Sequence, residues 1–456
     1  MAFHSGVPMR PKQQPKARHD DLFRARLDQI INMKHALVTL ADRIDWGWLD
    51  DELAECFSDQ GRPAEPVRFM VGMFLLKHTY GLSDEQVWDR WVNDPYFQYF
   101  TGEEFFQHEL GHERSGLSHW RKRIGGKLNI LLAESLRIAH DTGALKKSDL
   151  ARVTIDTTVQ PKNVAFPTDA RLLETAIRQL GKLARAHDVP LRQSYGRVAR
   201  RAAMMAGRYA HAQQFKRMRR QIKFLRTRLG RVIRDIRRQT ADDEALQEIF
   251  AVALGRAAQI RGQKQRQRGR KLYSWHAPEV ECIGKGKVRT PYEFGVKVSL
   301  TITNKRCKGG QFILHAKALP GNPYDGHTLK AVIEETEALT GREIERVYVD
   351  KGYVGHHAPK PYRVYRSGQK RGVHGQIRKE LRRRSAIEPV IGHCKSDGHL
   401  DRNFLHGRDG DQFNAVMSAV GYNLRLILKW LRKLLCKIIA AIWAAITQPS
   451  ALKPAS

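Results

Sequence analysis

The sequence has few features of a secreted or membrane-spanning protein. Its five cysteines are odd in number and none forms a C-x-x-C pair, so neither a disulfide framework nor a zinc ribbon is supported. The most apolar stretch, 434–446, contains Lys437 and is shorter than the ~20 residues that span a bilayer. The basic N-terminus lacks the apolar segment of a secretory signal. We therefore expect a cytoplasmic protein with reduced thiols and no membrane partner.

Acidic residues are also scarce relative to basic ones. The chain has 80 Lys and Arg against 47 Asp and Glu, a formal net charge of +33. A folded protein tolerates such self-repulsion better when its partner is a polyanion, so nucleic acid is the leading partner and an anionic membrane surface is the rival. With 456 residues, 41% of them hydrophobic, the chain has room for two or three domains and at least one sizeable core.

The first third of the chain has a helical pattern. Residues 1–22 are predicted to form a mobile basic tail, and 23–147 an all-helical domain. Within it, 63–81 is an apolar helix that ends at a glycine, and Ser83 begins another helix with a capping box. A further helix is expected after Ser118. Such a unit can be a helix-turn-helix reader of DNA or a plain helix bundle, and the pattern leaves both readings open.

A strongly basic helical insertion is predicted over 166–289. Between residues 195 and 238 there are fifteen Lys or Arg and one acid. Apolar residues at spacings of three and four over 215–236 indicate a narrow seam of coiled-coil type, which serves either oligomerisation or packing within the chain. A solvated basic helix usually has balancing acids, so their near absence favours phosphate contact. The candidate phosphate-binding residues here are Arg217, Arg220 and Arg234.

Strand patterns on both sides of this insertion predict a discontinuous α/β domain over 148–165 and 290–432. The first strand is expected at 151–160, where apolar and polar residues alternate. Two more strands should pair through the turn between them, and a helix, two short strands and two helices should follow. These elements are predicted at 292–303, 310–319, 326–341, 344–350, 362–365, around Glu388 and at 411–435. A C-terminal helix and tail complete the chain at 433–456.

Three carboxylates stand out in this domain. Asp156 lies on the first strand, Asp350 ends a later one, and Glu388 lies on the helix that follows. Each has a structural reading: a surface position, a turn, and a capping box with Ser385. Asp is nevertheless disfavoured in strands, and an open α/β sheet places its chemistry at strand ends. Together the acids call for a compensating charge, which two Mg²⁺ ions would supply while supporting in-line phosphoryl transfer.

Basic side chains surround the last acid. At about 100° per residue, Arg384, Glu388 and Lys395 fall within roughly 40° of one another on a helix. They form either a solvated salt-bridge ladder or part of a site that handles phosphates. In the second case Arg384 would bind a phosphate in bidentate fashion and Lys395 would act as a point charge. Lys351, next to Asp350, is a further phosphate-binding candidate.

Three segments carry a resemblance to a known family. "TIDTTVQPKNV", "VYVDKGY" and "AIEPVIGHCKSDGHLDRNFLHGRDGDQFNAVMSAVGYNLRLIL" resemble the catalytic segments of bacterial insertion-sequence DDE transposases, in particular the InsH-like group (the insertion-sequence-five family). Residues 80–102 resemble that group's N-terminal helical domain, and Arg384, Glu388 and Lys395 match its R-x3-E-x6-K arrangement. The resemblance implies an RNase H-like core with Asp156, Asp350 and Glu388 as the catalytic, metal-binding triad. The metal would be Mg²⁺, with Mn²⁺ as a substitute.

The resemblance also implies partners and a reaction. The expected reaction is cleavage at transposon ends followed by strand transfer into target DNA. The partners would be double-stranded DNA, as terminal inverted repeats and target, and further copies of the chain, because two ends must be joined. A bacterial, nucleoid-associated location would follow. The alternatives are a DNA-binding transposition repressor without catalysis and an RNase H-like nuclease that cuts without joining.

One position departs from the family pattern. The broader group often has Tyr three residues before the Arg, whereas this chain has Leu381. Excision through a hairpin intermediate is therefore not implied. Tyr353 does match the pattern, and it is either a DNA-handling or a packing residue.

Overall fold

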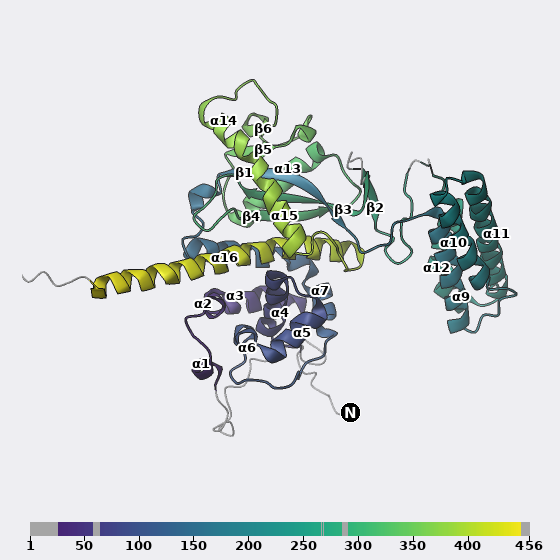
Figure 1. Cartoon of the computed structure of the whole chain (residues 1–456), viewed down its shortest axis with the longest axis horizontal. Coiled ribbons are helices and arrows are strands. Elements are labelled where there is room, and N and C mark those ends of the chain that lie inside the picture. The colour runs from purple at the N-terminus through teal and green to yellow at the C-terminus, as the bar shows by residue number, and fades with distance from the viewer. Residues whose placement is uncertain (1–25, 58–63, 266, 268, 285–290, 448–456) are drawn as a thin grey trace, which may run out of the picture. The chain divides into compact units, whose positions relative to one another are not determined.

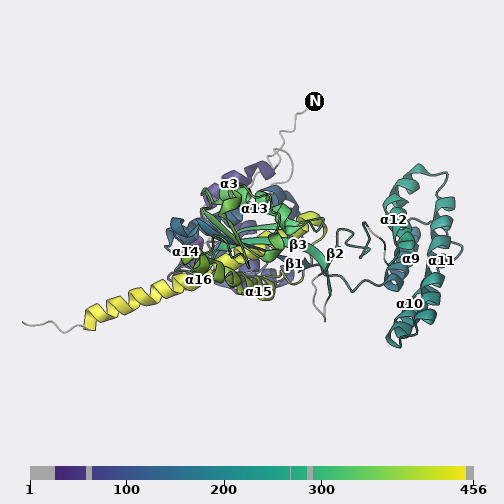
Figure 2. The same ribbon diagram turned by 90° about the horizontal axis from the view of Figure 1, so that it is seen from above.

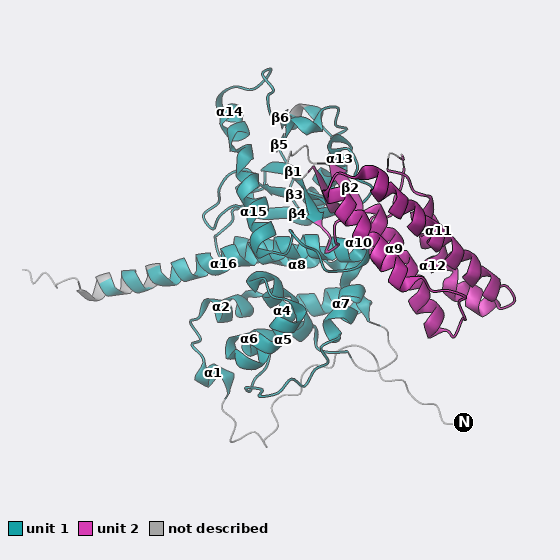
Figure 3. Cartoon of the chain, turned by 45° about the vertical axis from the view of Figure 1, so that its right-hand side comes forward, with its two compact units in different colours: residues 1–160, 297–456 teal, residues 161–296 magenta. Residues whose placement is uncertain are grey.

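The computed structural model describes residues 26–57, 64–265, 267, 269–284 and 291–447 (Figure 1). It divides into two compact units, Met1–Gln160 with Lys297–Ser456, and Pro161–Val296 (Figure 3). The tail predicted for residues 1–22 and the last residues of the predicted C-terminal segment lie outside the described residues. Within the described part, none of the helices combines the length and apolarity needed to cross a membrane.

The first unit begins with a set of short helices. Gly81, in a left-handed conformation with φ of 64°, ends the apolar helix α4, and Ser83 and Gln86 form the predicted capping box of α5. The single helix expected after Ser118 is instead two helices, because the pair at Gly125–Gly126 breaks it with a 3₁₀ turn. The elements are α1 (Leu27–Ile30), α2 (Ala36–Arg43), α3 (Trp46–Leu53), η2 (Ala54–Cys56), α4 (Val67–Tyr80), α5 (Asp84–Asn93), α6 (Pro95–Thr101), α7 (Gly116–Ile124), η3 (Gly125–Lys127), α8 (Asn129–Asp141) and η4 (Lys147–Asp149).

A mixed α/β region follows, and it confirms the five predicted strands to within a few residues. Its elements are β1 (Arg152–Pro161), β2 (Glu281–Gly284), β3 (Tyr292–Thr303), β4 (Ile313–Leu319), α13 (Asp325–Thr340), β5 (Arg346–Val349), η5 (Lys351–Tyr353), η6 (Pro361–Arg363), β6 (Val364–Arg366), α14 (Gly375–Arg382), η7 (Arg383–Ala386), α15 (Ile387–Asp397) and α16 (Gly407–Thr447). A further strand, β2, was not predicted and lies within 166–289, the segment predicted to be helical.

The sheet has the strand order β2-β3-β1-β5-β6, and β4 also pairs with β3. β1, β5 and β6 are parallel, whereas β4 is antiparallel to β3 through the predicted turn. Two backbone hydrogen bonds, from Asn304 to Arg152 and from Lys162 to Phe294, each 2.9 Å, show that β1 and β3 run in opposite directions. β1 is therefore a central strand with a parallel neighbour on one side and an antiparallel neighbour on the other.

The long helix α16 lies between the sheet and the N-terminal helices (Figure 1). It packs on β4 and on α4, α8 and α2, and Phe413 meets Phe74 of α4 with ring centroids 5.2 Å apart. β4 is buried along nearly its whole length because α13 also packs on it. The N-terminal helices and the α/β region thus share one hydrophobic core.

One close crossing fixes α16 against α4. A Cβ added at Gly421 would lie 2.2 Å from the carbonyl oxygen of His78, so only glycine fits there. One turn further, Arg425 Nη1 donates to the carbonyl oxygens of His78, Thr79 and Asp397 at 2.9, 3.3 and 3.2 Å. The first two bonds satisfy carbonyl groups at the end of α4, and the third satisfies one at the end of α15.

The second unit contains a basic four-helix bundle (Figure 2), formed by α9 (Asp169–Ala186), α10 (Gly196–His211), α11 (Phe215–Gln239) and α12 (Glu244–Gly262). The predicted seam on α11 points largely into the core of this bundle, where Leu225, Leu229, Val232 and Ile236 are buried. Phe215, the first residue of the seam, is 51% exposed. The seam is therefore mainly explained by packing within the chain.

We expect Gly421→Ala to destabilise the first unit by about 2 kcal/mol or more, because the methyl group would overlap the backbone of α4. Gly392→Ala in α15 is the matched control, since a Cβ there meets nothing within 4 Å and alanine favours a helix interior. Urea unfolding of the two variants measures the difference. Equal stability of both variants would contradict the close crossing.

A second prediction concerns Glu335 of α13, which accepts from His315 Nε2 at 3.2 Å and contacts Lys317, both on β4. These bonds hold the pKa of Glu335 at about 2, so its contribution to stability is present above about pH 4.5 and is lost as the pH falls toward 2. Glu335→Gln should therefore flatten the loss of unfolding free energy between pH 5 and pH 3. Glu334→Gln, at an exposed neighbouring position, should leave that slope unchanged.

Candidate active site

Strand register brings two of the three predicted acids to the same edge of the sheet. β1 and β5 are parallel, and Thr154 lies opposite Tyr348. Two residues further along each strand are Asp156, on β1, and Asp350, directly after β5. Because side chains alternate along a strand, both carboxylates lie on the same face of the sheet as Thr154 and Tyr348, at the carboxyl ends of these strands.

The third acid, Glu388, lies on a nearly continuous helical segment. α14 leads through the 3₁₀ turn η7, which contains Arg384, into α15, whose first turn contains Glu388. The predicted capping box is wrong: Ala386 precedes α15 and makes no side-chain cap, while the Ser385 hydroxyl donates to the Arg382 carbonyl at 3.4 Å. Since no helix starts afresh at Ser385, Glu388 is not used to cap one.

The guanidinium of Arg384 contacts all three acids. Its Nη1 lies 3.5 Å from Asp156 Oδ2, and its Nη2 lies 3.8 Å from Asp350 Oδ1 and 3.7 Å from Glu388 Oε1. The Arg384 side chain is 16% exposed. Carboxylates separated by up to 232 residues in the chain thus meet around one positive charge. Arg384 and Glu388 form the ion pair that their spacing allows, and Arg384 also reaches the two strand acids.

Asp156 is the most buried of these acids, and its environment opposes its ionisation. Burial, helped by the nearby carboxylates of Asp350 and Asp325, raises the pKa of Asp156 to about 6. The backbone N–H of Thr157, 2.8 Å from Asp156 Oδ1, and the charge of Arg384 act in the opposite direction. An added positive charge would therefore favour the ionised form of Asp156.

A fourth acid, Asp325, lies beside this group and was missed by the sequence reasoning. It is the first residue of α13, and its Oδ1 accepts from Thr157 Oγ1 and from Lys297 Nζ, each at 3.1 Å. The only signal in the sequence is an Asp at the start of a helix, which ordinarily indicates favourable interaction with the helix dipole. Its proximity to Asp156 depends on how α13 crosses the sheet.

The remaining predicted residues differ in exposure. Tyr353 is buried at 1% exposure, and burial, followed by the three carboxylates of Asp156, Asp325 and Asp350, raises its pKa well above the usual value. This burial favours the packing reading of Tyr353 over DNA handling. Lys351 is exposed directly after Asp350, and Lys395 is half-buried on α15.

A buried carboxylate fastens α14 to the strands below the acids. Glu380 is 4% exposed, receives Arg346 Nε at 2.9 Å and Gln376 Nε2 at 2.9 Å, and contacts the Tyr348 hydroxyl. Burial alone would raise the pKa of Glu380, but the hydrogen bonds from Tyr348, Gln376 and Arg346 lower it overall. Arg384 is one helical turn after Glu380, so this ion pair sets where Arg384 points.

Asn304 makes a second connection at the same level. Its side-chain Nδ2 donates to Thr154 Oγ1 on β1 and to the backbone carbonyl of Glu380, both at 3.0 Å. The Asn304 carbonyl in turn accepts from Arg383 Nε at 3.2 Å. The helix that bears Arg384 is therefore tied to β1, β3 and β5 by buried hydrogen bonds.

The donor set suits a hard divalent cation. Asp156, Asp350 and Glu388 offer carboxylate oxygens, the ligand type that Mg²⁺ prefers, and a positively charged group already stands among them. No group of three or more His, Cys, Asp or Glu in the described ranges is arranged as a metal-ligand set. The residues thus fit the cation in chemistry, while Arg384 provides their counter-charge in this arrangement.

Comparison with known families matches two parts of the chain. A family described as "Transposase domain (DUF772)" matches residues 25–123, and one described as "Transposase DDE domain" matches residues 260–424. The second match includes Asp350, Arg384 and Glu388. The chain belongs to the insertion-sequence DDE transposases. Its substrate is accordingly DNA.

A curated relative of this transposase is "Uncharacterized protein ORF8 in nfe locus" of Rhizobium meliloti. It is 50% identical over 208 residues, which make up 45% of this chain and 100% of the relative. No solved structure matches the chain.

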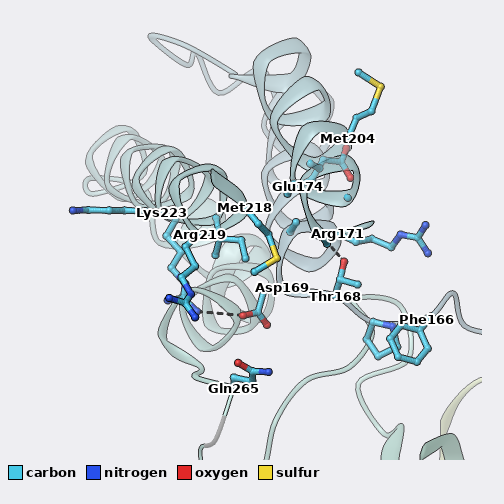
Figure 4. A pocket seen from close by; sticks show the side chains of 18 of the residues that line it. Phe166, Thr168, Asp169, Arg171, Glu174, Met204, Met218, Arg219, Lys223 and Gln265 are labelled. Carbon is cyan, nitrogen blue, oxygen red and sulfur yellow. Dashed lines mark hydrogen bonds and ion pairs between the residues drawn. The ribbon is translucent and has the colours of Figure 1, made fainter. Parts of the chain in front are cut away.

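A cavity of about 1180 Å³ lies in the bundle of the second unit (Figure 4). Arg219 and Lys223 of α11 and Met204 of α10 line it, and Phe166, 64% exposed, stands at its edge. None of the three acids of the transposase lines this cavity, so its size does not identify it as the place of the chemistry.

Glu380→Ala should destabilise the transposase by about 3 kcal/mol, because it leaves the buried Tyr348 hydroxyl and the half-buried Arg346 without their partner. Glu345→Ala is the control: that side chain is 56% exposed and contacts Arg152 only at 3.8 Å. Chemical unfolding of both variants tests the difference. A loss of less than 1 kcal/mol for Glu380→Ala would show that the ion pair does not hold α14.

Proposed function

We propose that this transposase cuts DNA at the ends of its insertion sequence and joins them to target DNA in a Mg²⁺-dependent reaction. The observation that carries this proposal is the meeting of Asp156, Asp350 and Glu388 around Arg384. A purely structural role does not require three carboxylates from distant segments at one strand edge, where unpaired acids oppose one another.

The proposed core is RNase H-like, and the strand order supports it. β1, β3 and β4 form an antiparallel run, and β5, reached through α13, adds in parallel to the other side of β1. Asp156 on the central strand and Asp350 after its parallel neighbour are then adjacent by topology alone. We propose that this core extends over 148–165 and 290–432, as the strand patterns of the sequence predict, with the helical domains on either side as predicted.

In the proposed reaction, Asp156, Asp350 and Glu388 hold two Mg²⁺ ions, with Mn²⁺ as a substitute. The ions would supply a Lewis acid that activates a water or 3′-hydroxyl and stabilises the leaving oxygen. Arg384, relieved of its role as the counter-charge of the acids, is then placed to bind a phosphate oxygen. Exposed Lys351 and half-buried Lys395 add positive charge on the two sides of the acids.

DNA binding is proposed for two further regions. The helical region 23–147 would contact the terminal inverted repeats, as an N-terminal domain of a transposase. In the bundle, Arg217, Arg220 and Arg234 are exposed on α11 and would contact phosphates. Joining two ends requires two active sites, so we propose that the working form is a homo-oligomer.

A non-catalytic repressor and a nuclease that cuts without joining remain as alternatives. A repressor has no use for the acid cluster, which favours an enzyme. The nuclease would use the same residues and differs only in whether a 3′-hydroxyl or a water attacks.

The test uses purified protein, labelled DNA with the flanking ends of the gene, a target plasmid and Mg²⁺. We expect joined products from the wild type and a loss of at least ~10²-fold with Glu388→Gln or Asp156→Asn. Glu334→Gln, an exposed substitution of equal charge, should retain activity. Cleavage without joining would establish the nuclease, and tight binding without cleavage by the wild type would establish the repressor.

A further inference from the structure

A small hollow on the surface of the bundle is lined mainly by arginine. It has a volume of about 230 Å³ and lies where the loop before α10 meets the last turns of α11. Its lining residues are Arg192, Gln193, Tyr195, Arg231, Arg234, Asp235 and Arg238. Four guanidinium groups therefore share this space with one carboxylate.

That carboxylate is used to build the hollow. Asp235 is 5% exposed, and its Oδ2 accepts the backbone N–H of Arg192 at 2.8 Å. Its Oδ1 accepts from Arg238 Nη2 at 3.2 Å. Both oxygens are thus occupied, one in fixing the loop and the other in positioning an arginine. Asp235 leaves most of the positive charge of the hollow uncompensated.

Tyr195 provides the second support. It precedes α10 in a left-handed conformation with φ of 55°, which is uncommon for a residue other than glycine. The guanidinium of Arg228 lies 5.3 Å from the centre of its ring, and Arg231 Nη1 donates to its hydroxyl at 3.5 Å. Tyr195 thus contacts two arginines of α11, of which Arg231 lines the hollow.

Helix geometry aligns the remaining charges. Arg231, Arg234 and Arg238 occur at i, i+3 and i+7 of α11, so they share one face of the helix, away from buried Leu229 and Val232. Within the described parts of the chain, the side chains of Arg192, Arg231 and Arg234 form no ion pair. Like charges held this close repel, and an anion placed among them would relieve the repulsion.

We propose that this hollow binds a phosphate group of a DNA backbone. Guanidinium groups converging from two segments match the several oxygens of a phosphate, with which arginine forms bidentate hydrogen bonds. The site is too small to take a base pair. The assignment of the polymer as DNA rests on the proposed function, whereas the recognition of a phosphate rests on the arginines alone.

The test compares two double variants of the full-length chain with equal loss of charge. Arg231→Gln/Arg234→Gln removes two arginines of the hollow, and Arg185→Gln/Arg237→Gln removes two exposed arginines of the same bundle outside it. Affinity for a random-sequence duplex is measured without divalent ions as a function of salt. Each lost phosphate contact lowers the slope of log K against log [salt] by about 0.9.

We expect the first variant to lower that slope by about two and the affinity in 0.1 M salt by roughly 50-fold, and the control to change affinity by less than about fivefold. Arg192→Gln, on the other segment, should lower the slope by about one. Equal losses in the two double variants would overturn the proposal, since they would show general attraction alone. Unchanged affinity in the first variant would also overturn it.

A third arm distinguishes the source of the phosphate. Inorganic phosphate and ATP are titrated as competitors of the duplex. If phosphate and ATP compete with the duplex only at millimolar concentration, and no longer compete in the Arg231→Gln/Arg234→Gln variant, the hollow is a site for the DNA backbone. A single phosphate binds weakly because it lacks the added contacts of a polymer. Tight binding of ATP with unchanged affinity for DNA would overturn the backbone assignment. No arm requires cleavage or joining, so failure here is separable from failure of the transposase reaction.

Discussion

The contact of Arg384 with three acids is the constraint on which the first unit depends. Asp156, Asp350 and Glu388 reach the same point from a central strand, a strand end and a helix. An isolated buried carboxylate is costly and would tend to protonate, as the raised pKa of Asp156 shows. A single delocalised cation that reaches all three makes their proximity tolerable. The arrangement also defines a place where positive charge is favoured, which is the property that a metal-dependent reaction needs.

The position of Arg384 is in turn set by polar groups below it. Glu380, one turn earlier, binds Arg346 and Tyr348 of β5, and Asn304 joins β1 to the backbone of the same helix. Thr154 accepts the bond from Asn304, and the Tyr348 hydroxyl contacts Glu380. These two residues lie two positions before Asp156 and Asp350, on the same faces of β1 and β5. On each of these two strands, the residue that supports the helix and the site acid are therefore successive side chains on one face. A buried network of this kind specifies one orientation of the helix, which apolar packing alone would leave less well defined.

Local patterns in the sequence predicted five of the six described strands and marked the three acids as candidates. The alternation around Asp156 and the short apolar run before Asp350 indicated half-buried strands, and the structure has β1 and β5 there. The role of Asp325 was not predictable, because only the path of α13 across the sheet brings it beside Thr157. The reading of Ser385 as the start of a capping box was wrong: Ser385 and Glu388 match the motif, but α14 and η7 already lead into α15 without a break. Motifs of a few residues are reliable only when the preceding element ends where they require it.

Charge is distributed differently in the two units, and the difference follows from where acids are placed. In the first unit, Glu335, Glu380 and the three site acids each have a cation within ion-pair distance, and several of these pairs are buried or half-buried. On α11 the single acid, Asp235, is buried and both its oxygens are consumed in positioning Arg192 and Arg238. Carboxylates thus neutralise cations in the first unit, whereas the carboxylate on α11 positions arginines that remain largely unneutralised. One carboxylate among four arginines offsets only a small part of their positive charge. The arginines around Asp235 therefore keep a positive potential that attracts a polyanion.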